Sequence, residues 1–202
     1  MSKEIGIYSD FIEFSENDLI NYYYYTNTFT SEEMEKLESQ LDELKLYKGT
    51  IDSGANNVNL TYRDSRISWL PKIDKYLWIY KKIGDLAIKA NKTLWNFDLI
   101  GMSENLQYTE YDESYKGFYD WHCDVGSGNS AKRKISISIQ LSGPEEYEGG
   151  ELKLFYKRKQ VITPKEKGTM ILFPSFMMHK VEPVTRGKRR SLVIWISGPA
   201  FR

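Results

Sequence analysis

The sequence predicts an α+β fold that is mainly β, a sandwich or barrel of the jelly-roll kind with supporting helices before it in the chain. Seven short segments of the second half have strand character, and turn-forming residues separate them. Both segments with helical periodicity lie before residue 100. Short strands at this spacing are typical of jelly rolls, and helices that precede such a sheet pack on its outer face.

The length and composition favour one domain. A chain of 202 residues is enough for one good-sized domain and short of two, and 41% hydrophobic residues are enough for a packed core. No break in composition divides the chain. We therefore expect a single domain over residues 1–202, with helical support in about 1–100 and the β-core in about 101–202.

The charge balance and the lone cysteine restrict partners and compartment. Lys and Arg number 28, as do Asp and Glu, so no bulk attraction to nucleic acid or acidic lipid is expected. No signal peptide and no run of 18 apolar residues is visible, so we expect a soluble cytoplasmic protein without membrane contact. Cys123, expected to be a small buried residue, fits a reducing compartment. The oligomeric state is left open.

The first predicted helix follows Thr30. Thr30 and Glu33 form the pattern of a capping box, in which each side chain bonds the other residue's backbone N–H. Apolar residues then recur at three- and four-residue steps, at Met34, Leu37, Leu41 and Leu44. We expect this helix to end near residues 47–49, where glycine acts as the stop.

A second helix is predicted after Pro71, to about Ala90. Its apolar stripe comprises Ile73, Leu77, Tyr80, Ile83 and Ala87. Residues 51–59, rich in Asn, Gly and Ser, predict a loop between the helices. The tyrosine run 22–25 has two interpretations, an edge or packed strand and a substrate-contacting aromatic patch, of which the strand is favoured.

The second half predicts the β-core. The expected strands are 106–111, 118–122, 134–141, 151–156, 169–173, 180–184 and 189–196. Turn signals separate them at 126–129, 143–150, 164–168 and 186–187. The basic runs 132–134 and 157–159 are interpreted as solvated turns.

The chain holds only two histidines, and both lie where a metal site is possible. In His122-Cys123-Asp124, side chains two apart on a strand point to the same side, so the imidazole and the carboxylate can converge on one ion. His179 follows the strand 169–173 and can complete a triangle. Two histidines and one carboxylate leave three coordination positions open, as in non-haem Fe(II) oxygenases. The sequence therefore favours iron over a closed zinc site.

A candidate anion anchor lies ten residues after His179. Arg189 starts a strand on which Ser191 shares its face, while Arg190 points to the other side. A buried arginine needs a partner, and a small dicarboxylate fits because the planar guanidinium donates two hydrogen bonds to a carboxylate. The alternative for Arg189 is a solvated residue of the basic run 188–190.

These motifs, in order, resemble the prolyl-4-hydroxylase-like branch of the Fe(II)/2-oxoglutarate dioxygenases, and in particular its small bacterial and viral hydroxylases. The matching residues are His122-x-Asp124, Gly149-Gly150-Glu151-Leu152, Leu172-Phe173-Pro174, His179-x-Val181-x-Pro183-Val184, Gly187-x-Arg189 and Trp195. The resemblance covers roughly residue 60 to the C-terminus. It implies a double-stranded β-helix with helices supporting one sheet.

The resemblance implies roles for individual residues. In this family two histidines and an aspartate bind iron, which implies His122, Asp124 and His179 as catalytic metal ligands. A basic residue ten positions after the second histidine binds the distal carboxylate of 2-oxoglutarate, which implies Arg189, with Ser191 beside it.

A tyrosine on the strand before the first histidine often helps to bind 2-oxoglutarate. Tyr111 is the best match, and Tyr108 is the alternative. Some members carry a further tyrosine on the strand after the aspartate, but the run 135–141 has none, so the contacts to the co-substrate must differ in detail.

The reaction that the resemblance implies is hydroxylation of an unactivated C–H bond. Fe(II) is the cofactor, 2-oxoglutarate and O₂ are consumed, and succinate and CO₂ are released. Ascorbate is a candidate reductant. The favoured substrate is a prolyl residue in a peptide or protein, and a free amino acid or another small molecule is the alternative. Oxidative demethylation of a nucleobase is disfavoured because Trp195 stands where such enzymes carry a second arginine. An alternative of another class is a non-catalytic jelly-roll metal-binding module.

Overall fold

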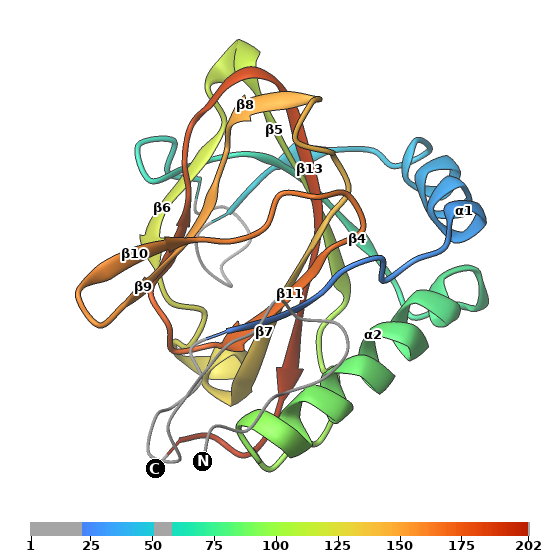
Figure 1. Ribbon diagram of the computed structural model, residues 1–202, viewed down its shortest axis with the longest axis vertical. Helices are drawn as coiled ribbons and strands as arrows, with labels where there is room; N and C mark the ends of the chain where they lie inside the picture. Colours follow the sequence, from blue (N-terminus) through green and yellow to red (C-terminus); the bar gives the residue numbers. More distant parts are fainter. Residues whose placement is uncertain (1–21, 51–57, 202) are drawn as a thin grey trace.

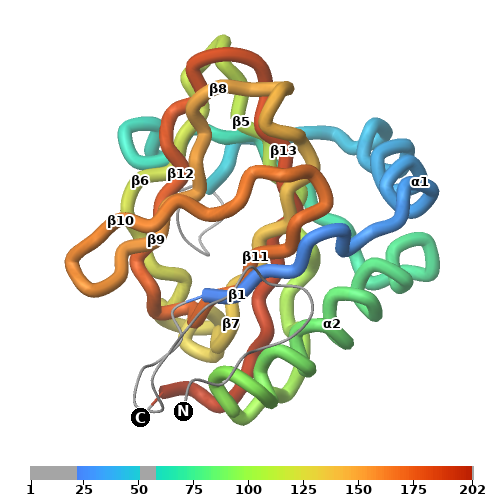
Figure 2. The backbone as a smooth tube through the Cα atoms, in the orientation of Figure 1, coloured from blue at the N-terminus to red at the C-terminus, as the bar shows by residue number. Residues whose placement is uncertain are grey.

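The computed structural model describes residues 22–50 and 58–201. Two antiparallel sheets face each other, and both helices lie on the outer side of the larger sheet (Figure 1). The fold is the predicted double-stranded β-helix, because strands close in sequence alternate between the two sheets. The path of the chain between them can be followed in Figure 2.

The larger sheet has eight strands and the smaller one five. In spatial order the larger sheet runs β1 (Tyr23–Tyr25), β11 (Met170–Pro174), β7 (Arg133–Gln140), β13 (Val184–Ser197), β5 (Leu106–Asp112), β4 (Arg66–Leu70) and β2 (Tyr47–Lys48), with β8 (Tyr147–Gly149) paired to β13. The smaller sheet runs β10 (Lys159–Ile162), β9 (Leu152–Tyr156), β12 (His179–Val181), β6 (Phe118–His122) and β3 (Arg63–Asp64).

Two apolar clusters hold these layers together. On β11, Met170 and Leu172 belong to the cluster that includes the helices, whereas Ile171 and Phe173 belong to the cluster that includes Leu154 of the smaller sheet. This alternation is what a strand buried on both faces requires. One face of the larger sheet therefore carries the helices, and the other is free to build a site against the smaller sheet.

The first helix forms as predicted but is shorter. In α1 (Ser31–Leu41), Thr30 and Glu33 make both hydrogen bonds of the capping box. The helix ends at Leu41 instead of near residues 47–49, because residues 47 and 48 form β2 and pair with β4. Extended pairing at the edge of the sheet replaces the last expected turn.

The second helix, α2 (Asp74–Leu94), extends slightly beyond the predicted end. Its buried face contains Ile83 and Ala87 as expected. The predicted stripe is wrong at Ile73, which is exposed and precedes the first turn, and at Leu77, which is 44% exposed. Tyr80 is buried as predicted, and Tyr76 and Ile79 carry the contact in place of Ile73 and Leu77.

All seven predicted strands are present, with shifts of a few residues at their ends. The main difference is at 186–187, where a turn was expected: β13 continues through these residues and pairs there with β8. Gly187 adopts φ 71°, and a Cβ there would lie 2.1 Å from the carbonyl oxygen of Glu146, so only glycine fits this close approach. The turn signal thus marks a bend inside a long strand.

Strands β2, β3, β4, β8 and β10 were not predicted. Several have only two or three residues, too few for an alternating pattern to be visible. Two short helical turns complete the described chain, η1 (Glu113–Tyr115) and η2 (Gly128–Lys132).

The tyrosine run forms the predicted edge strand, since among the described residues β1 pairs with β11 alone, at one end of the larger sheet. Most of the predicted loop 51–59 lies outside the described residues. Within the described part of the chain, neither helix combines the length and apolar character needed to cross a membrane.

Candidate functional site

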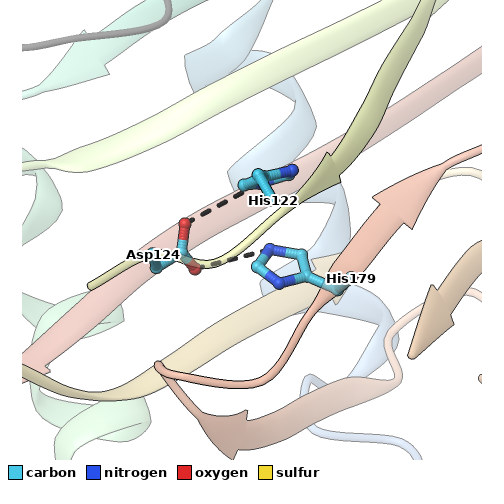
Figure 3. Close-up of side chains that lie close together, drawn as sticks. All are labelled: His122, Asp124 and His179. Atoms are coloured by element: carbon cyan, nitrogen blue, oxygen red, sulfur yellow. Dashed lines mark ion pairs between the residues drawn. The ribbon is translucent and has the colours of Figure 1, made fainter. Parts of the chain in front are cut away.

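Three side chains from separate segments meet between the two sheets (Figure 3). His122 ends β6, His179 begins β12, and Asp124 follows β6 by two residues. Asp124 Oδ1 lies 3.8 Å from His122 Nε2, and Asp124 Oδ2 lies 3.5 Å from His179 Nε2. One potential ligand atom from each residue lies within 4.8 Å of the others, a spacing that one metal ion can bridge.

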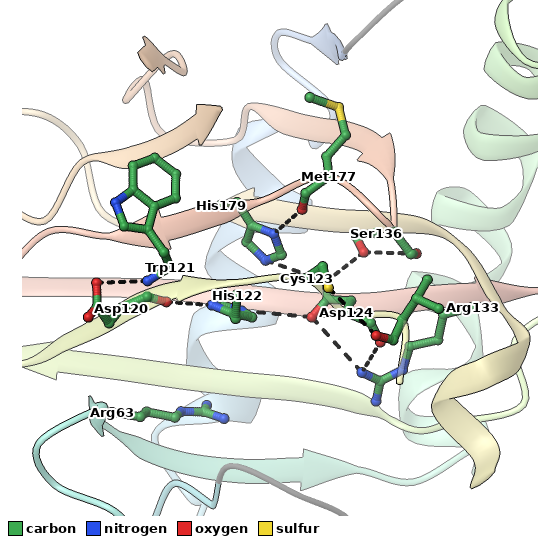
Figure 4. Close-up of polar contacts among 12 residues, drawn as sticks. Arg63, Asp120, Trp121, His122, Cys123, Asp124, Arg133, Ser136, Met177 and His179 are labelled. Carbon is green, nitrogen blue, oxygen red and sulfur yellow. Dashed lines mark hydrogen bonds and ion pairs between the residues drawn. The ribbon is translucent and has the colours of Figure 1, made fainter. Parts of the chain in front are cut away.

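Backbone carbonyls set the orientation of both imidazoles. His122 Nδ1 lies 2.7 Å from the carbonyl oxygen of Asp120, and His179 Nδ1 lies 2.9 Å from that of Met177 (Figure 4). Each Nδ1–H therefore donates to a carbonyl, which leaves the Nε2 lone pair directed towards Asp124. Metal-binding histidines in proteins are held in this way.

The carboxylate of Asp124 is also fixed. Ser136 Oγ donates to Asp124 Oδ2 at 2.5 Å, and Ser136 Oγ lies 2.9 Å from Ser175 Oγ. The backbone N–H of Asp124 donates to the carbonyl of Ser175 at 2.9 Å, and Arg133 donates to the carbonyl of Asp124 at 3.2 Å. These contacts hold the carboxylate between the histidines before any ligand arrives.

The protonation states suit metal binding. Burial, followed by repulsion from His179, lowers the pKa of His122 to about 3, so its imidazole is neutral at neutral pH. Burial acts to raise the pKa of Asp124, but attraction from the two histidines and Arg133, together with the hydrogen bond from Ser136, outweighs it and lowers the pKa to about 2. A neutral imidazole and an ionised carboxylate are the forms that bind a metal.

The convergence of His122 and Asp124 arises differently from the prediction. The two side chains were expected on one face of a strand, but β6 ends at His122 and Asp124 lies on the following loop, bonded through its backbone to Ser175. The expectation that Cys123 is buried is wrong, because this residue is exposed on the same loop. Because Asp124 lies on a loop, strand alternation does not determine the direction of its side chain.

A cavity of about 560 Å³ extends from the three side chains to Arg189. Its walls on the larger sheet follow strand alternation: Arg189, Ser191, Val193 and Trp195 of β13 all line it. Arg190 points to the other side, where it pairs with Glu146. The predicted register of this strand is therefore confirmed, and Arg189 shares one cavity with the histidines.

Arg189 is buried and has no acidic partner among the described residues. Its side chain is 1% exposed, and its contacts include Nη2 to Gln140 Oε1 at 3.0 Å, Nη1 to Ser191 Oγ at 3.5 Å, the face of Tyr111 at 5.5 Å and the hydroxyl of Tyr147. Its Nε–H has no acceptor among the described residues. A buried cation with neutral partners and a spare donor is suited to bind an anion from outside the chain.

The two candidate tyrosines lie on opposite faces of β5. Tyr111 lines the cavity and faces Arg189, with which it pairs across the strands. Tyr108 packs in the cluster that includes the helices and lies apart from the cavity. Gln140, at the end of β7, supplies an acceptor to Arg189 where the sequence offers no tyrosine.

Several cavity residues were not predicted. Arg133 was interpreted as part of a solvated basic run, but it forms an ion pair with Glu104 at 2.5 Å and its guanidinium carbon lies 3.7 Å from the centre of the Trp195 ring. Tyr119 stacks on His122 with ring centres 3.6 Å apart, and Arg63 packs on the same tyrosine. These contacts join distant segments, so no local pattern predicts them. Alternation along β13 places Trp195 on the face of Arg189. Regular alternation along β6 would turn Tyr119 away from His122, but the register of β6 against β12 shifts between these two residues.

The donor set fits a ferrous ion. The imidazole nitrogens of His122 and His179 and one carboxylate oxygen of Asp124 would hold such an ion, and a metal bound by only these three ligands would have positions open to a co-substrate. The far end of that cavity carries the Arg189 guanidinium, whose Nε–H has no acceptor among the described residues. A small molecule with a metal-chelating end and a carboxylate end matches both features.

Comparison with known proteins places these observations in a family. Residues 106–197 match the model of the 2OG-Fe(II) oxygenase superfamily. The chain is 27% identical over 180 residues to the PKHD-type hydroxylase PiuC of Pseudomonas aeruginosa, which covers 83% of this chain and 74% of the relative. It is 40% identical over 84 residues to a PKHD-type hydroxylase of Janthinobacterium sp., which covers 39% of this chain and 37% of the relative.

Solved structures share the fold. A prolyl hydroxylase of Trichoplax adhaerens, in complex with a peptide of hypoxia inducible factor, superposes with a TM-score of 0.73 at 19% identity, covering 88% of this chain and 84% of the other. A prolyl-4-hydroxylase of Pseudomonas putida superposes with a TM-score of 0.68 at 18% identity, covering 89% and 94%. The family match over residues 106–197 and the PKHD-type relatives lead to one assignment: the chain is a 2-oxoglutarate-dependent dioxygenase of the 2OG-Fe(II) oxygenase superfamily, similar to the PKHD-type hydroxylases.

Proposed function

We propose that this dioxygenase hydroxylates an unactivated C–H bond of a prolyl residue in a peptide or protein and releases succinate and CO₂. The observation that carries the proposal is one cavity that joins His122, Asp124 and His179 to the buried Arg189, which pairs with no carboxylate of the described residues. Iron and 2-oxoglutarate bound there supply the oxidant that turns C–H into C–OH with one atom of O₂.

In this proposal, His122 Nε2, His179 Nε2 and one oxygen of Asp124 hold the ferrous ion. The carbonyls of Asp120 and Met177 keep each Nε2 unprotonated, because each Nδ1–H is committed to them. Ser136 keeps the carboxylate from rotating, and ascorbate is the proposed reductant that keeps the iron ferrous.

Arg189 binds the distal carboxylate of 2-oxoglutarate. Its Nε–H and its unused Nη hydrogens offer the paired donors that a carboxylate accepts, and Ser191 Oγ lies beside them. Gln140 holds one Nη group in place, and the Tyr111 ring covers one face of the guanidinium. The co-substrate is thus oriented with its keto acid towards the metal ligands.

The other end of the cavity receives the substrate. Glu104 accepts two hydrogen bonds from Arg133, at 2.7 and 2.5 Å, and the guanidinium carbon of Arg133 lies over the Trp195 ring, 3.7 Å from its centre. This rigid pair offers an aromatic surface for a proline ring and N–H groups for a peptide carbonyl. The PKHD-type and prolyl hydroxylase relatives support the choice of a prolyl substrate.

The helical part and the β-core are proposed to act as one domain over 1–202. Strands β1, β3 and β4 from the first half complete both sheets, and Arg63 from that half lines the cavity. A β-core without residues before 101 would lack one wall of its own site.

The test is turnover with defined substrates. Full-length protein with Fe(II), 2-oxoglutarate and O₂ is incubated with a panel of proline-containing peptides and amino acids, and products are scored by a mass gain of one oxygen and by succinate. We expect hydroxylated product and succinate in equal amounts, and neither with Asp124→Ala. Succinate-independent product, or full turnover by Asp124→Ala, would contradict the proposal.

A further inference from the structure

A second buried arginine lines the same cavity. Arg63, on β3, is 6% exposed and reaches from the smaller sheet to Gln107 on the larger one. Its guanidinium carbon lies 4.6 Å from the centre of the Tyr119 ring, and that ring stacks on His122. Figure 4 shows Arg63 on the side of His122 and Arg133 on the side of Asp124.

Every described partner of Arg63 is neutral. Its Nε–H donates to Ser65 Oγ at 2.8 Å, one Nη1–H to the carbonyl of Thr50 at 2.9 Å and one Nη2–H to Gln107 Oε1 at 3.1 Å. A guanidinium carries five N–H groups, so two remain. The neighbouring Asp64 pairs with Arg66 instead, so no described carboxylate neutralises Arg63.

Gln107 adds a further donor at the same place. Its Oε1 accepts from Arg63 and, at 3.2 Å, from Thr109 Oγ1, which fixes the orientation of the amide. Its Nε2 makes no hydrogen bond with the described residues, although the side chain is buried and lines the cavity. Arg63 and Gln107 thus present spare donors and no spare strong acceptor, which is the pattern of an oxyanion site.

This donor pair is distinct from the anchor at Arg189. Gln107 pairs with Val193, four residues beyond Arg189 on β13. At about 3.4 Å per residue, the two rows of the sheet are roughly 13 Å apart. A carboxylate held at Arg63 therefore belongs to a different part of the cavity from one held at Arg189.

Given the proposed function, the balance of charges in the cavity also favours a negatively charged group on the substrate. Its charged lining consists of Arg63, Arg133, Arg189, Glu104 and Asp124. Glu104 neutralises Arg133. The three negative charges of Asp124 and the doubly negative 2-oxoglutarate would balance the two positive charges of a ferrous ion and the one of Arg189. One buried positive charge is left over, and a singly charged anion on the substrate would neutralise it.

We propose that the hydroxylated substrate carries a carboxylate on the reacting residue or on its immediate neighbour, and that Arg63 and Gln107 bind it. This inference rests on the proposed function and narrows its substrate class. A carboxylate can come from three sources: a free amino acid, the C-terminal residue of a peptide, or an acidic side chain beside the proline. All three share the planar anion that a guanidinium and an amide can clamp.

The first experiment compares matched probes that differ only in this charge. The pairs are L-proline and L-prolinamide, N-acetylglycylproline and its amide, and acetyl-glutamyl-prolyl-glycinamide and its glutaminyl counterpart. For at least one pair, we expect the wild-type enzyme to have a kcat/KM at least about tenfold higher for the carboxylate member than for the amide member. This is the scale of a charge-assisted hydrogen-bond pair. The pair that shows this preference identifies the source.

The second experiment changes the protein. Arg63→Gln should remove this preference by raising KM for the carboxylate probe alone, and Arg63→Lys, which keeps the charge without the planar fork, should restore part of it. Arg66→Gln is the matched control, because Arg66 is the neighbouring arginine, bound to Asp64 and outside the cavity lining. It should leave the preference intact.

A third variant covers the case in which Arg63→Gln does not fold. Gln107→Glu gives Arg63 an internal carboxylate, so the fold keeps its contact while the substrate carboxylate is repelled. Binding is measured by calorimetry without oxygen, with Fe(II) and 2-oxoglutarate present, so that affinity is read without turnover. We expect the carboxylate member of the preferred pair to lose at least about tenfold in affinity, and its amide to be unaffected.

Three results would overturn the inference. They are equal use of both members of every pair by wild type, a preference unchanged in Arg63→Gln and Gln107→Glu, and a rise in the 2-oxoglutarate requirement of Arg63→Gln in place of a substrate effect. Succinate formation distinguishes failure of this inference from failure of the proposed function. If the protein hydroxylates the neutral and the charged probes equally, the proposed function stands and the inference is wrong. If the protein makes no succinate and binds no carboxylate probe, both the proposed function and the inference are wrong.

Discussion

The hydroxyl of Ser136 shows how one residue outside the metal triad can control it. It donates to Asp124 Oδ2 at 2.5 Å and lies 2.9 Å from Ser175 Oγ, so it links the carboxylate to β7 and to the segment after β11. Partners of this kind typically change metal affinity by about 10- to 100-fold when removed.

We therefore predict that Ser136→Ala weakens iron binding by about 10- to 100-fold while the fold is kept. The measurement is an anaerobic Fe(II) titration of metal-free protein. Ser138→Ala, two residues further on the same strand and also in the cavity, is the control and should bind iron like wild type. Equal losses in both variants would argue against a specific role for Ser136.

At Arg189 the prediction concerns 2-oxoglutarate alone. Arg189→Ala should raise the 2-oxoglutarate concentration required for succinate formation by at least about tenfold and leave iron binding in place, because the guanidinium is distant from the metal ligands. Arg190→Ala, which removes the outward-facing neighbour paired with Glu146, should leave the requirement unchanged. If Arg190→Ala has the larger effect, the assignment of the anchor is wrong.

Sequence reasoning found site residues that belong to a rare residue type or that lie on a strand with a clear alternation. His122 and His179 are the only histidines, and Arg189 follows from the alternation of its strand. Arg63 and Gln140 could not be predicted, since their contacts to Gln107 and Arg189 bridge 44 and 49 residues. Such contacts depend on how the two sheets are placed, which periodicity does not encode.

Among the elements, α2 offers a sharp test of packing. Ile83 is fully buried against the larger sheet, whereas Leu77, six residues earlier, is 44% exposed. Ile83→Ala should cost about 2 to 5 kcal/mol of unfolding free energy, because it leaves a cavity in the core. Leu77→Ala should reduce the unfolding free energy by much less, because its side chain is partly exposed. Denaturant unfolding of both variants measures the difference. Equal costs would mean that the helix packs in the predicted rather than the observed register.

Glu182, directly after β12, is an ion-paired carboxylate whose contribution to stability depends on pH. Glu182 accepts from Lys153 and Lys180, each at 2.7 Å. Partial burial raises the pKa of Glu182, but the hydrogen bonds from the two lysines outweigh it, and the pKa is lowered. A carboxyl with a depressed folded-state pKa stabilises the protein above its unfolded pKa, and this stability is lost as the pH falls through the folded pKa.

We predict that Glu182→Gln lowers the thermal midpoint at pH 7, by the equivalent of about 1 kcal/mol, and that the difference from wild type shrinks in acid. Melting both proteins across a pH series gives the result. Glu148→Gln, which removes an exposed pair with Arg186, should change little at any pH. A difference that grows towards low pH would contradict the sign of this linkage.

The long elements were predictable and the short ones were not. The second helix and the strand around 134–141 carry enough residues for a period to stand out. Strands β2 and β3 have two residues each, and only their partners in the sheet define them. The predicted turn at 186–187 failed because Gly187 serves a close approach to Glu146 within a continuous strand.

For the whole molecule, the two sheets divide the chemistry between them. The smaller sheet supplies the histidines and Arg63, and the larger sheet supplies Arg189 and its neighbours. The helices bury the outer face of the larger sheet, so its inner face can be polar without loss of the core. The fold class followed from the number and spacing of strands, but the pairing between sheets depended on contacts across the whole chain.

The most direct test of the central claim is an anaerobic titration of the full-length protein with Fe(II) and 2-oxoglutarate, followed by visible absorption. If His122, Asp124 and His179 hold one ion that the keto acid chelates, a metal-to-ligand charge-transfer band should appear only when both are present, at one iron per chain. His179→Ala should abolish the band, and Arg189→Ala should shift its appearance to higher 2-oxoglutarate. A band that persists in His179→Ala, or no iron bound by wild type, would contradict the claim.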